Sequence, residues 1–190
     1  SFADALFEFY QEGGETRWHA IYLGTDSTKV GPIRSARKVD ARLEQIFQSI
    51  FVFNAADYRV WNWYEYEDVR RFTLVEGGAA PCPAICRDTS QIQINQVYGN
   101  TAEIRKAAAR VGIPEIIPDL TGWVFREEPP AMQAVVNTVR VRYLTNKAIA
   151  EWRYNPEAHR YYRWSETADK SGKLEPLTDR EAEVLELLGQ

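Results

Sequence analysis

The feature that most constrains the fold is the strict alternation of apolar and charged residues near the C-terminal end of the chain. Val139, Val141 and Tyr143 alternate with arginines, and a two-residue period is that of a β-strand whose two faces differ. Residues 148–154 and 159–164 are the next strand candidates, joined by the turn sequence Asn-Pro-Glu-Ala. Three such segments in succession predict a meander of antiparallel strands.

The arginines of this meander have a simple structural interpretation. Alternate positions of an antiparallel sheet with one solvated face are commonly charged, so we expect these arginines to form a water-exposed outer face. They are Arg140, Arg142, Arg153, Arg160 and Arg163.

A second β-pattern lies near the start of the chain. Side chains alternate through residues 5–10, and residues 16–23 form a second strand after the turn sequence Glu-Gly-Gly-Glu at 12–15. Glycine accepts the positive φ angles that tight turns need, so the pattern predicts a β-hairpin. Residues 30–33 are a candidate short strand, and the apolar run at 50–53 predicts a buried one.

Helical spacing occurs between and after these strands. Ser35 is a candidate N-cap for a helix whose apolar side chains recur at helical intervals. That stripe comprises Val39, Leu43, Ile46, Phe47 and Ile50. A second helix begins after Asn100 and ends at Gly112. We also expect a short helix within residues 55–71 and a terminal helix capped by Thr178.

Together the patterns predict an α+β (mixed α/β) fold. Residues 1–115 combine the N-terminal hairpin and central strands with two helices, and residues 116–190 combine the antiparallel meander with the terminal helix. We expect these two segments to form one compact unit, because 190 residues suffice for one ordinary domain or for a small domain built from two subdomains.

Composition restricts the kinds of partner. The formal net charge is −4, and 17 arginines stand against 6 lysines. No global basic field therefore draws the chain to nucleic acid, and we predict no nucleic-acid partner. No apolar stretch approaches the roughly 20 residues of a membrane helix. We expect contact with a membrane only through a lipid anchor outside residues 1–190. The chain begins at Ser1 without Met, so we expect a trimmed or processed N-terminus.

Two charged clusters are candidate ligand-binding segments, and both lie in the first 40 residues. They supply the candidate site residues Glu8, Glu12, Arg17, Arg34, Ser35 and Arg37. The second cluster enters a helix, where unpaired N–H groups and bidentate guanidinium donors accept phosphate, pyrophosphate or carboxylate.

A structural interpretation of the same clusters stays open. Cation runs at a helix start are often structural pairs. Arg34 and Arg37 would then pair with Glu8, Glu12 or Asp40 and hold the hairpin on the helix. The glutamates are candidates for acid–base work, but their spacing does not demand it. His19 and His159 are single strand residues and are expected to be structural.

The two cysteines are Cys82 and Cys86, in a C-x₃-C spacing with no second pair and no nearby His. Four-ligand zinc sites usually need two such pairs, so we predict no metal and no other cofactor. A local disulfide and two unpaired thiols are both compatible with the spacing. A disulfide would favour an oxidising compartment.

The front motifs also resemble a known family. The motifs are Ala3-Asp4, Glu8, Glu12-Gly13-Gly14-x-Thr16-Arg17 and Gly31-Pro32-Ile33-Arg34-Ser35-Ala36-Arg37. In this order and spacing they resemble the bacterial YerB-like lipoproteins, and looser similarity extends through about residue 165. The family's opening strand is missing, and Asn95-Gln96 replaces a usual histidine–asparagine pair. The resemblance implies an extracytoplasmic, membrane-anchored or secreted protein, without implying a reaction.

These observations lead to one leading hypothesis and two alternatives. The leading hypothesis is an extracytoplasmic binding or interaction domain whose partner is a small anionic ligand or an envelope component. The first alternative is an envelope enzyme acting on a phosphate- or pyrophosphate-bearing substrate, with a glutamate as base. The second is a purely structural envelope protein.

Overall fold

The computed structural model describes residues 3–12, 14–69, 73–75, 80–124, 136–144, 147–166 and 173–176. Contacts divide the chain into two compact units. The first unit combines residues 1–25 with residues 124–190, and the second comprises residues 26–123. None of the helices within the described ranges is long and apolar enough to cross a membrane.

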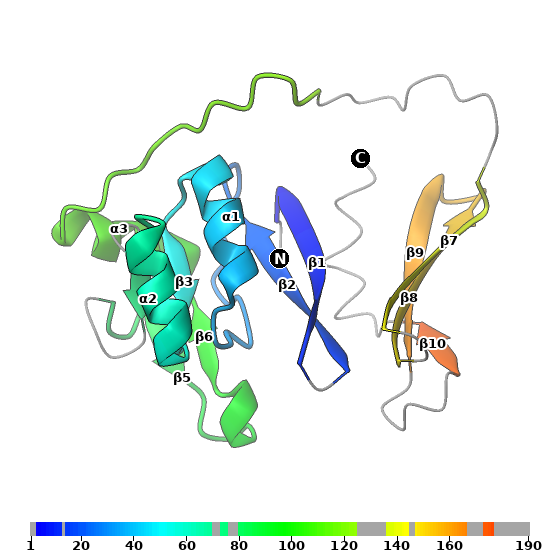
Figure 1. Ribbon diagram of the computed structural model, residues 1–190, viewed down its shortest axis with the longest axis horizontal. Helices are drawn as coiled ribbons and strands as arrows, with labels where there is room; N and C mark the ends of the chain where they lie inside the picture. Colours follow the sequence, from blue (N-terminus) through cyan, green and yellow to red (C-terminus); the bar gives the residue numbers. More distant parts are fainter. Residues whose placement is uncertain are drawn as a thin grey trace. The chain divides into compact units, whose positions relative to one another are not determined.

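The described elements confirm a mixed α+β fold, and Figure 1 shows them along the chain. In chain order they are β1 (Ala5–Gln11), β2 (Glu15–Ile21), α1 (Lys38–Phe47), β3 (Phe51–Phe53), α2 (Tyr58–Tyr66), β4 (Thr73–Val75), β5 (Ile85–Arg87), η2 (Gln93–Asn95), β6 (Val97–Gly99), α3 (Thr101–Arg110), β7 (Thr138–Leu144), β8 (Lys147–Asn155), β9 (Arg160–Glu166) and β10 (Leu174–Pro176).

In the first unit, β1 and β2 form the predicted hairpin. The strands are antiparallel, with Glu8 opposite Trp18 and Phe9 opposite Arg17. Because successive side chains point to opposite faces of a strand, Glu8 and Trp18 share one face of the hairpin and Arg17 lies on the other.

The predicted meander is also confirmed. Strands β7, β8 and β9 pair antiparallel in sequence, and β10 extends the sheet beyond β9. Strand β10 has no counterpart among the strands expected from the sequence. The predicted terminal helix at Thr178 lies outside the described residues.

One face of this sheet meets the hairpin. The Tyr143 hydroxyl donates a hydrogen bond to the backbone oxygen of Glu8 over 3.4 Å. Ala150 is fully buried on this face. Arg163 lies opposite Trp152, which places both on the face of Ala150. Arg163 is only 6% exposed.

The expectation that all five meander arginines face water is therefore wrong for Arg163. Arg163 lies at an odd-numbered position of β9, and these positions point to the face of the sheet that meets the hairpin. Glu8 of the hairpin supplies the opposite charge there. The other four arginines lie on the opposite face of the β7–β10 sheet, which is its second face, as the pairing of β7, β8 and β9 shows.

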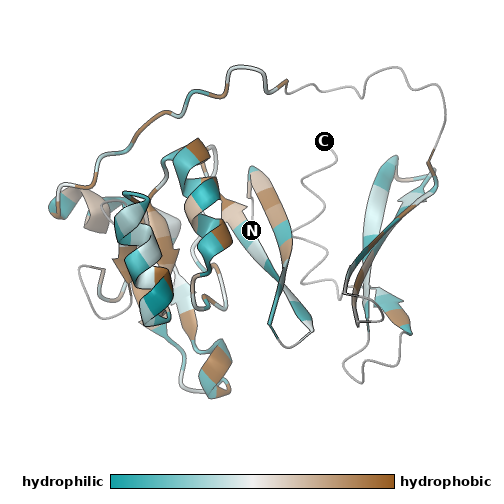
Figure 2. Cartoon of the chain, in the orientation of Figure 1, coloured by the Kyte–Doolittle hydropathy of each residue, from teal (hydrophilic) through white to brown (hydrophobic). Residues whose placement is uncertain are grey.

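The second unit is built on two apolar clusters. One gathers Leu74, Ala80, Ala84, Ile85, Val97, Ile104, Ala107 and Ala108. The other gathers Ala36, Ala41, Phe51, Phe53, Val60, Tyr64 and Val69. The predicted buried strand is confirmed as β3, which is brown in Figure 2, whereas α2 is mostly pale with teal segments. Strand β3 pairs parallel with β4, and β5 pairs antiparallel with β6.

Helix α1 differs from its prediction in its start and its buried face. Its N-cap is Arg37, not Ser35, because the Asp40 carboxylate accepts a hydrogen bond from the Arg37 backbone N–H over 2.6 Å. The helix buries Asp40 and Glu44, while Val39 and Ile46 are 38% and 45% exposed. The buried carboxylates accept hydrogen bonds from Arg37 N–H and Ser49 Oγ, which reduces the cost of burying them.

Helix α3 follows its prediction closely. The Asn100 side chain caps it by accepting a hydrogen bond from the Glu103 backbone N–H. Gly112, with a φ of 76°, follows the end of the helix. The candidate strand at 30–33 reduces to a single bridge between Val30 and Gly99. Pro32 has no N–H to donate, so a strand cannot continue its ladder through that residue.

The remaining differences concern the cysteines and the division of the chain. Cys82, three residues before β5, and Cys86, within β5, form a disulfide, which decides between the two alternatives left by the sequence. The predicted segments, 1–115 and 116–190, stay a prediction of domain organisation. The contacts group the hairpin with residues from 124 onward.

Candidate functional site

The six sequence-predicted site residues fall in two different units. Glu8, Glu12 and Arg17 belong to the hairpin of the first unit, and Arg34, Ser35 and Arg37 precede α1 in the second.

Glu8 is held in a closed polar cluster. Its carboxylate accepts hydrogen bonds from Arg163 Nε over 3.0 Å, from Arg163 Nη2, and from Thr16 Oγ1 over 2.7 Å. The side chain of Glu8 is 10% exposed and that of Arg163 is 3% exposed. The Trp18 ring centroid lies 5.3 Å from the Arg163 guanidinium carbon. This bidentate, buried arrangement stabilises the packing of hairpin on sheet.

The other hairpin candidates lie apart from this pair. Arg17 points from the opposite face of the hairpin, where its Nε donates to the Gln11 side-chain oxygen over 3.1 Å. Glu12 is exposed in the turn. The structure therefore does not bring Arg17 into the cluster of Glu8.

In the second set, Arg34 and Arg37 both donate to backbone oxygens. Arg37 Nη1 donates to the backbone oxygens of Ser35 and Ala36, over 3.1 Å each. Arg34 Nη1 donates to the backbone oxygen of Ile94. These contacts favour a structural role for the two guanidinium groups, and their binding of an anion stays a prediction.

Charged side chains that are more accessible to solvent lie on the second face of the β7–β10 sheet. Rows of cross-strand neighbours run across this face. In one row Arg140, Glu151, Trp164 and Pro176 lie side by side on four strands, and in the next row Arg153 lies beside Tyr162. Direct cross-strand neighbours are about 5 Å apart, so their side chains interact.

Glu151 is the centre of this face. It is 2% exposed, and its two oxygens accept from different arginines: Arg153 Nε reaches Oε1 over 2.6 Å, and Arg140 reaches Oε2. Desolvation raises the pKa of Glu151, but the hydrogen bonds and charges of Arg153 and Arg140 outweigh it, so the net pKa lies below its ordinary value. Glu151 is therefore ionised and fixes the planes of both guanidinium groups.

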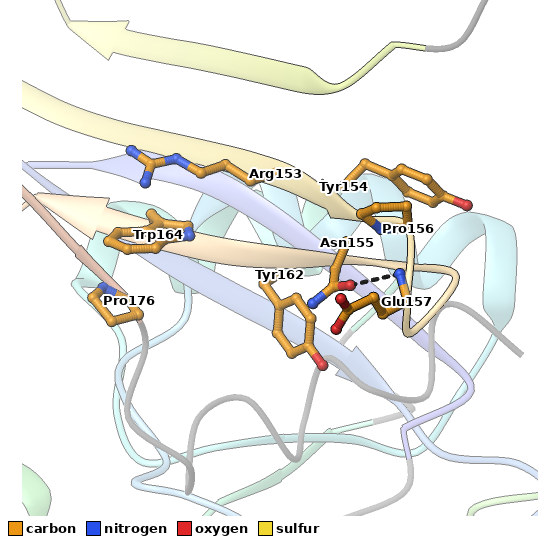
Figure 3. Close-up of a pocket in the computed structure, with 8 residues that line it drawn as sticks. All are labelled: Arg153, Tyr154, Asn155, Pro156, Glu157, Tyr162, Trp164 and Pro176. Atoms are coloured by element: carbon orange, nitrogen blue, oxygen red, sulfur yellow. Dashed lines mark hydrogen bonds between the residues drawn. The ribbon is translucent and has the colours of Figure 1, made fainter.

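Arg153 has a second fixed neighbour. Its guanidinium carbon lies 3.8 Å from the centroid of the Trp164 ring, which is cation–π geometry. Figure 3 shows the guanidinium lying along Trp164, with Pro176 on the other side of the ring. Within the described ranges, the two Nη atoms of Arg153 have no hydrogen-bond partner, and the side chain is 41% exposed. The group is oriented, charged and accessible.

A groove of about 500 Å³ runs from this arginine to the β8–β9 turn. Its lining residues come from β8, the turn, β9 and β10. They are Arg153, Tyr154, Asn155, Pro156, Glu157, Tyr162, Trp164 and Pro176. Figure 3 shows Tyr162 between the Trp164 end and the turn, while the ring of Tyr154 points away. The volume falls within the range of sites for small ligands.

The turn end of the groove is polar and well ordered. Asn155 Oδ1 accepts from the backbone N–H groups of Glu157 and Ala158, over 2.8 and 3.1 Å. This use of the oxygen leaves the amide N–H₂ of Asn155 as a donor. The exposed carboxylate of Glu157 adds an acceptor. The groove thus has a cationic end and a turn end with both donor and acceptor groups.

The chemistry of this arrangement suits binding. Among the residues that the structure describes, no group of three or more His, Cys, Asp or Glu could hold a metal ion. Glu8 and Glu151, two largely inaccessible carboxylates among the described residues of the first unit, are both engaged by arginines.

Sequence reasoning placed Arg140 and Arg153 on a solvated face but assigned them no role. The signal that could have found the site is Glu151, an acidic residue in a strand whose same-face neighbours on adjacent strands include arginine and tryptophan. Its significance depends on register, which the alternation alone does not set.

Comparison with known proteins assigns the chain to a family. Residues 1–114 match the family described as "Protein of unknown function (DUF3048) N-terminal domain", so the chain belongs to this family. A solved protein that the chain resembles is YerB of Bacillus subtilis, known from a crystal structure. The two share 26% sequence identity with a TM-score of 0.69, over 92% of this chain and 59% of YerB.

These findings confirm the predicted YerB-like relationship. The chain spans 59% of the length of YerB, so the whole of that protein is not represented. None of the curated proteins is similar enough to this chain to count as a match.

Proposed function

We propose that this chain is a binding domain whose groove on β8 and β9 takes a ligand bearing a carboxylate or phosphate group. The observation that carries the proposal is the state of Arg153, whose guanidinium is fixed by Glu151 and Trp164 while its Nη atoms point to no protein acceptor in the described residues. A preorganised planar fork of this kind suits bidentate contact with an oxyanion.

The turn end adds a requirement on the ligand. Glu157 accepts hydrogen bonds and repels a second anionic group, whereas Asn155 donates through its amide. A ligand with an anionic group at one end and hydroxyl or amine groups at the other complements both ends of the groove. This assignment moves the proposed anion contact from Arg34 and Arg37 to Arg153.

The proposal includes an extracytoplasmic location. The disulfide between Cys82 and Cys86 supports it, since disulfides persist in oxidising compartments. The family resemblance adds the expectation of an envelope protein with a lipid anchor.

The catalytic alternative has less geometric support. A general base must reach the proton that it removes, and Glu8 instead faces Arg163 and Thr16 in a cluster that is almost closed to solvent. A purely structural role is the alternative that the binding experiment tests directly.

The test is a titration of the whole chain, once with glucuronate and once with inorganic phosphate. Binding is monitored through the indole N–H signals of the tryptophans in NMR spectra. We expect saturable shifts of the Trp164 signal with at least one of the two anions. Arg153→Lys keeps the charge but loses the fork, and is expected to weaken binding about tenfold.

The matched control is Arg110→Lys, at an exposed position on α3, which is expected to leave the titration unchanged. Absence of saturable shifts with both anions would overturn the proposal in favour of a structural role. Equal binding by the Arg153→Lys protein would also overturn the site, because the fork is the feature on which it rests.

A further inference from the structure

The arginines of the second sheet face form a series that continues past the groove. Arg142 and Arg140 lie on β7, Arg153 on β8 and Arg160 on β9. Their registers place each in a different row of cross-strand neighbours. Same-face residues of one strand are about 7 Å apart, so one cation occurs in each successive row along the sheet.

This series makes the face positive on a chain of net charge −4. The strand residues of the face include four arginines and two glutamates. The glutamates are Glu151, between Arg140 and Arg153, and Glu166, which accepts from the Ala148 N–H over 2.8 Å. Arg142 is exposed and has no polar partner among the described residues. A concentrated positive face attracts a ligand of opposite charge.

We propose that the occupant of this face is an acidic polysaccharide, a chain of uronic acid sugars that lies across the arginine rows with one sugar in the groove. The inference rests on the proposed function, because the groove provides the first contact. It goes further in making the ligand a polymer, whose successive carboxylates meet successive arginines.

The lining of the groove favours sugar over another polyanion. Tyr162 gives a flat apolar surface beside Arg153 (Figure 3), and a sugar ring offers an apolar C–H face between its hydroxyl groups. Glu157 accepts hydrogen bonds from hydroxyl groups. The same carboxylate opposes a phosphate at that position, which makes a phosphodiester chain less complementary.

The arrangement also explains why the guanidinium groups are fixed in advance. Arg140 and Arg153 are both oriented by one ionised glutamate, so a ligand does not have to order these two long side chains. Ordering them on binding would reduce the affinity. A ligand that contacts several rows at once binds with a higher affinity than any single contact provides.

The experiment compares galacturonate oligomers from one to six sugars, measured by calorimetry with the whole chain. We expect the hexamer to bind at least about tenfold more tightly than the monomer. A neutral galactose oligomer of equal length and an oligothymidylate are measured in parallel, and both are expected to bind more weakly than the acidic hexamer.

Two variants make the test specific. Arg142→Gln, outside the groove, is expected to weaken binding of the hexamer much more than binding of the monomer, and to reduce the salt dependence of hexamer binding. Arg110→Gln on α3 is the matched control for loss of one exposed charge, with no effect expected on either ligand.

The outcomes separate this inference from the proposed function. If the monomer binds but affinity does not rise with length, the ligand is not a polymer, and the proposal of a groove for a small anion still stands. If oligothymidylate binds more tightly than the acidic hexamer, the ligand is not a polysaccharide. If the neutral oligomer binds as tightly as the acidic hexamer, the arginines do not recognise the carboxylates. Failure of every acidic ligand, monomer included, would overturn both proposals.

Discussion

Glu151 shows how one side chain can set the properties of a whole surface. It occupies a strand position facing outward, yet it is 2% exposed because Arg140, Arg153 and Trp164 surround it. A buried carboxylate is tolerated only with such partners. Without its charge, the two guanidinium groups would repel each other and lose their common anchor.

Lowering the pH is expected to destabilise the first unit through Glu151. Its pKa is below the ordinary value of 4.5 when the chain is folded, so its contribution is complete above that ordinary value and is lost as the pH falls through the lowered one. The measurement is the urea midpoint of unfolding between neutral and acid pH, followed by the Trp164 indole signal.

Glu151→Gln is expected to be less stable at neutral pH and to show a flatter acid profile. Glu157→Gln is the control, since Glu157 is exposed in the turn. A Glu151→Gln protein with the acid profile of the unchanged chain would contradict the assignment.

At the scale of elements, the second unit depends on very short strands. Strands β5 and β6 have three residues each, with Ile85 opposite Gly99. Ile85 and Ala84 are buried in an apolar cluster. The disulfide between Cys82 and Cys86 closes a small loop at this position, and so limits the conformations of the unfolded segment.

Removing this disulfide is expected to lower the free energy of unfolding of the second unit. The loop is short, so chain entropy sets the effect at about 2 kcal/mol. The measurement is urea unfolding of the Cys82→Ala/Cys86→Ala double variant, followed by far-ultraviolet circular dichroism. Reduction of the unchanged chain should give the same loss. An unchanged midpoint in both cases would show that the disulfide contributes nothing to this unit.

Elements with a strong local signal were predictable from the sequence. The hairpin, the meander and α3 each follow from alternation, turn residues or a capping residue that acts within a few positions. The buried face of α1 was not predictable in this way. Asp40 and Glu44 are buried because Arg37 and Ser49 supply hydrogen bonds, while the apolar Val39 and Ile46 are exposed.

The candidate site was less predictable than the fold, for a related reason. The sequence singled out Arg34 and Arg37 because they lie close together along the chain. Arg153 owes its environment to Glu151 and Trp164, and Trp164 lies on the next strand. Arg163 lies on the face of the sheet that meets the hairpin, where its partner is Glu8, 155 positions away in the sequence. Partners of this kind depend on register and tertiary packing, which local patterns do not determine.

At the scale of the whole molecule, the ion pair between Glu8 and Arg163 joins the two segments of the first unit. Glu8→Gln leaves Arg163 as an uncompensated buried charge, and breaking such a pair costs about 3–5 kcal/mol. We expect faster amide hydrogen exchange in both the hairpin and strands β7 to β9, with exchange in residues 26–123 unchanged.

The control is the double variant Glu8→Leu/Arg163→Met, which removes both charges and is expected to regain much of the lost protection. Equal acceleration of exchange in residues 26–123 would instead show that the chain unfolds as one unit. That result would favour the single compact unit predicted from the sequence over two separate units.

The long separation of Glu8 and Arg163 has a consequence for the order of synthesis. A ribosome adding about 5–20 residues per second needs about 8–30 s to advance the 155 positions from Glu8 to Arg163. Residues 26–123 are complete before Arg163 exists. An isolated two-stranded hairpin is marginally stable in water, so β1 and β2 must wait, with the face that receives the sheet uncovered, until β9 has been translated.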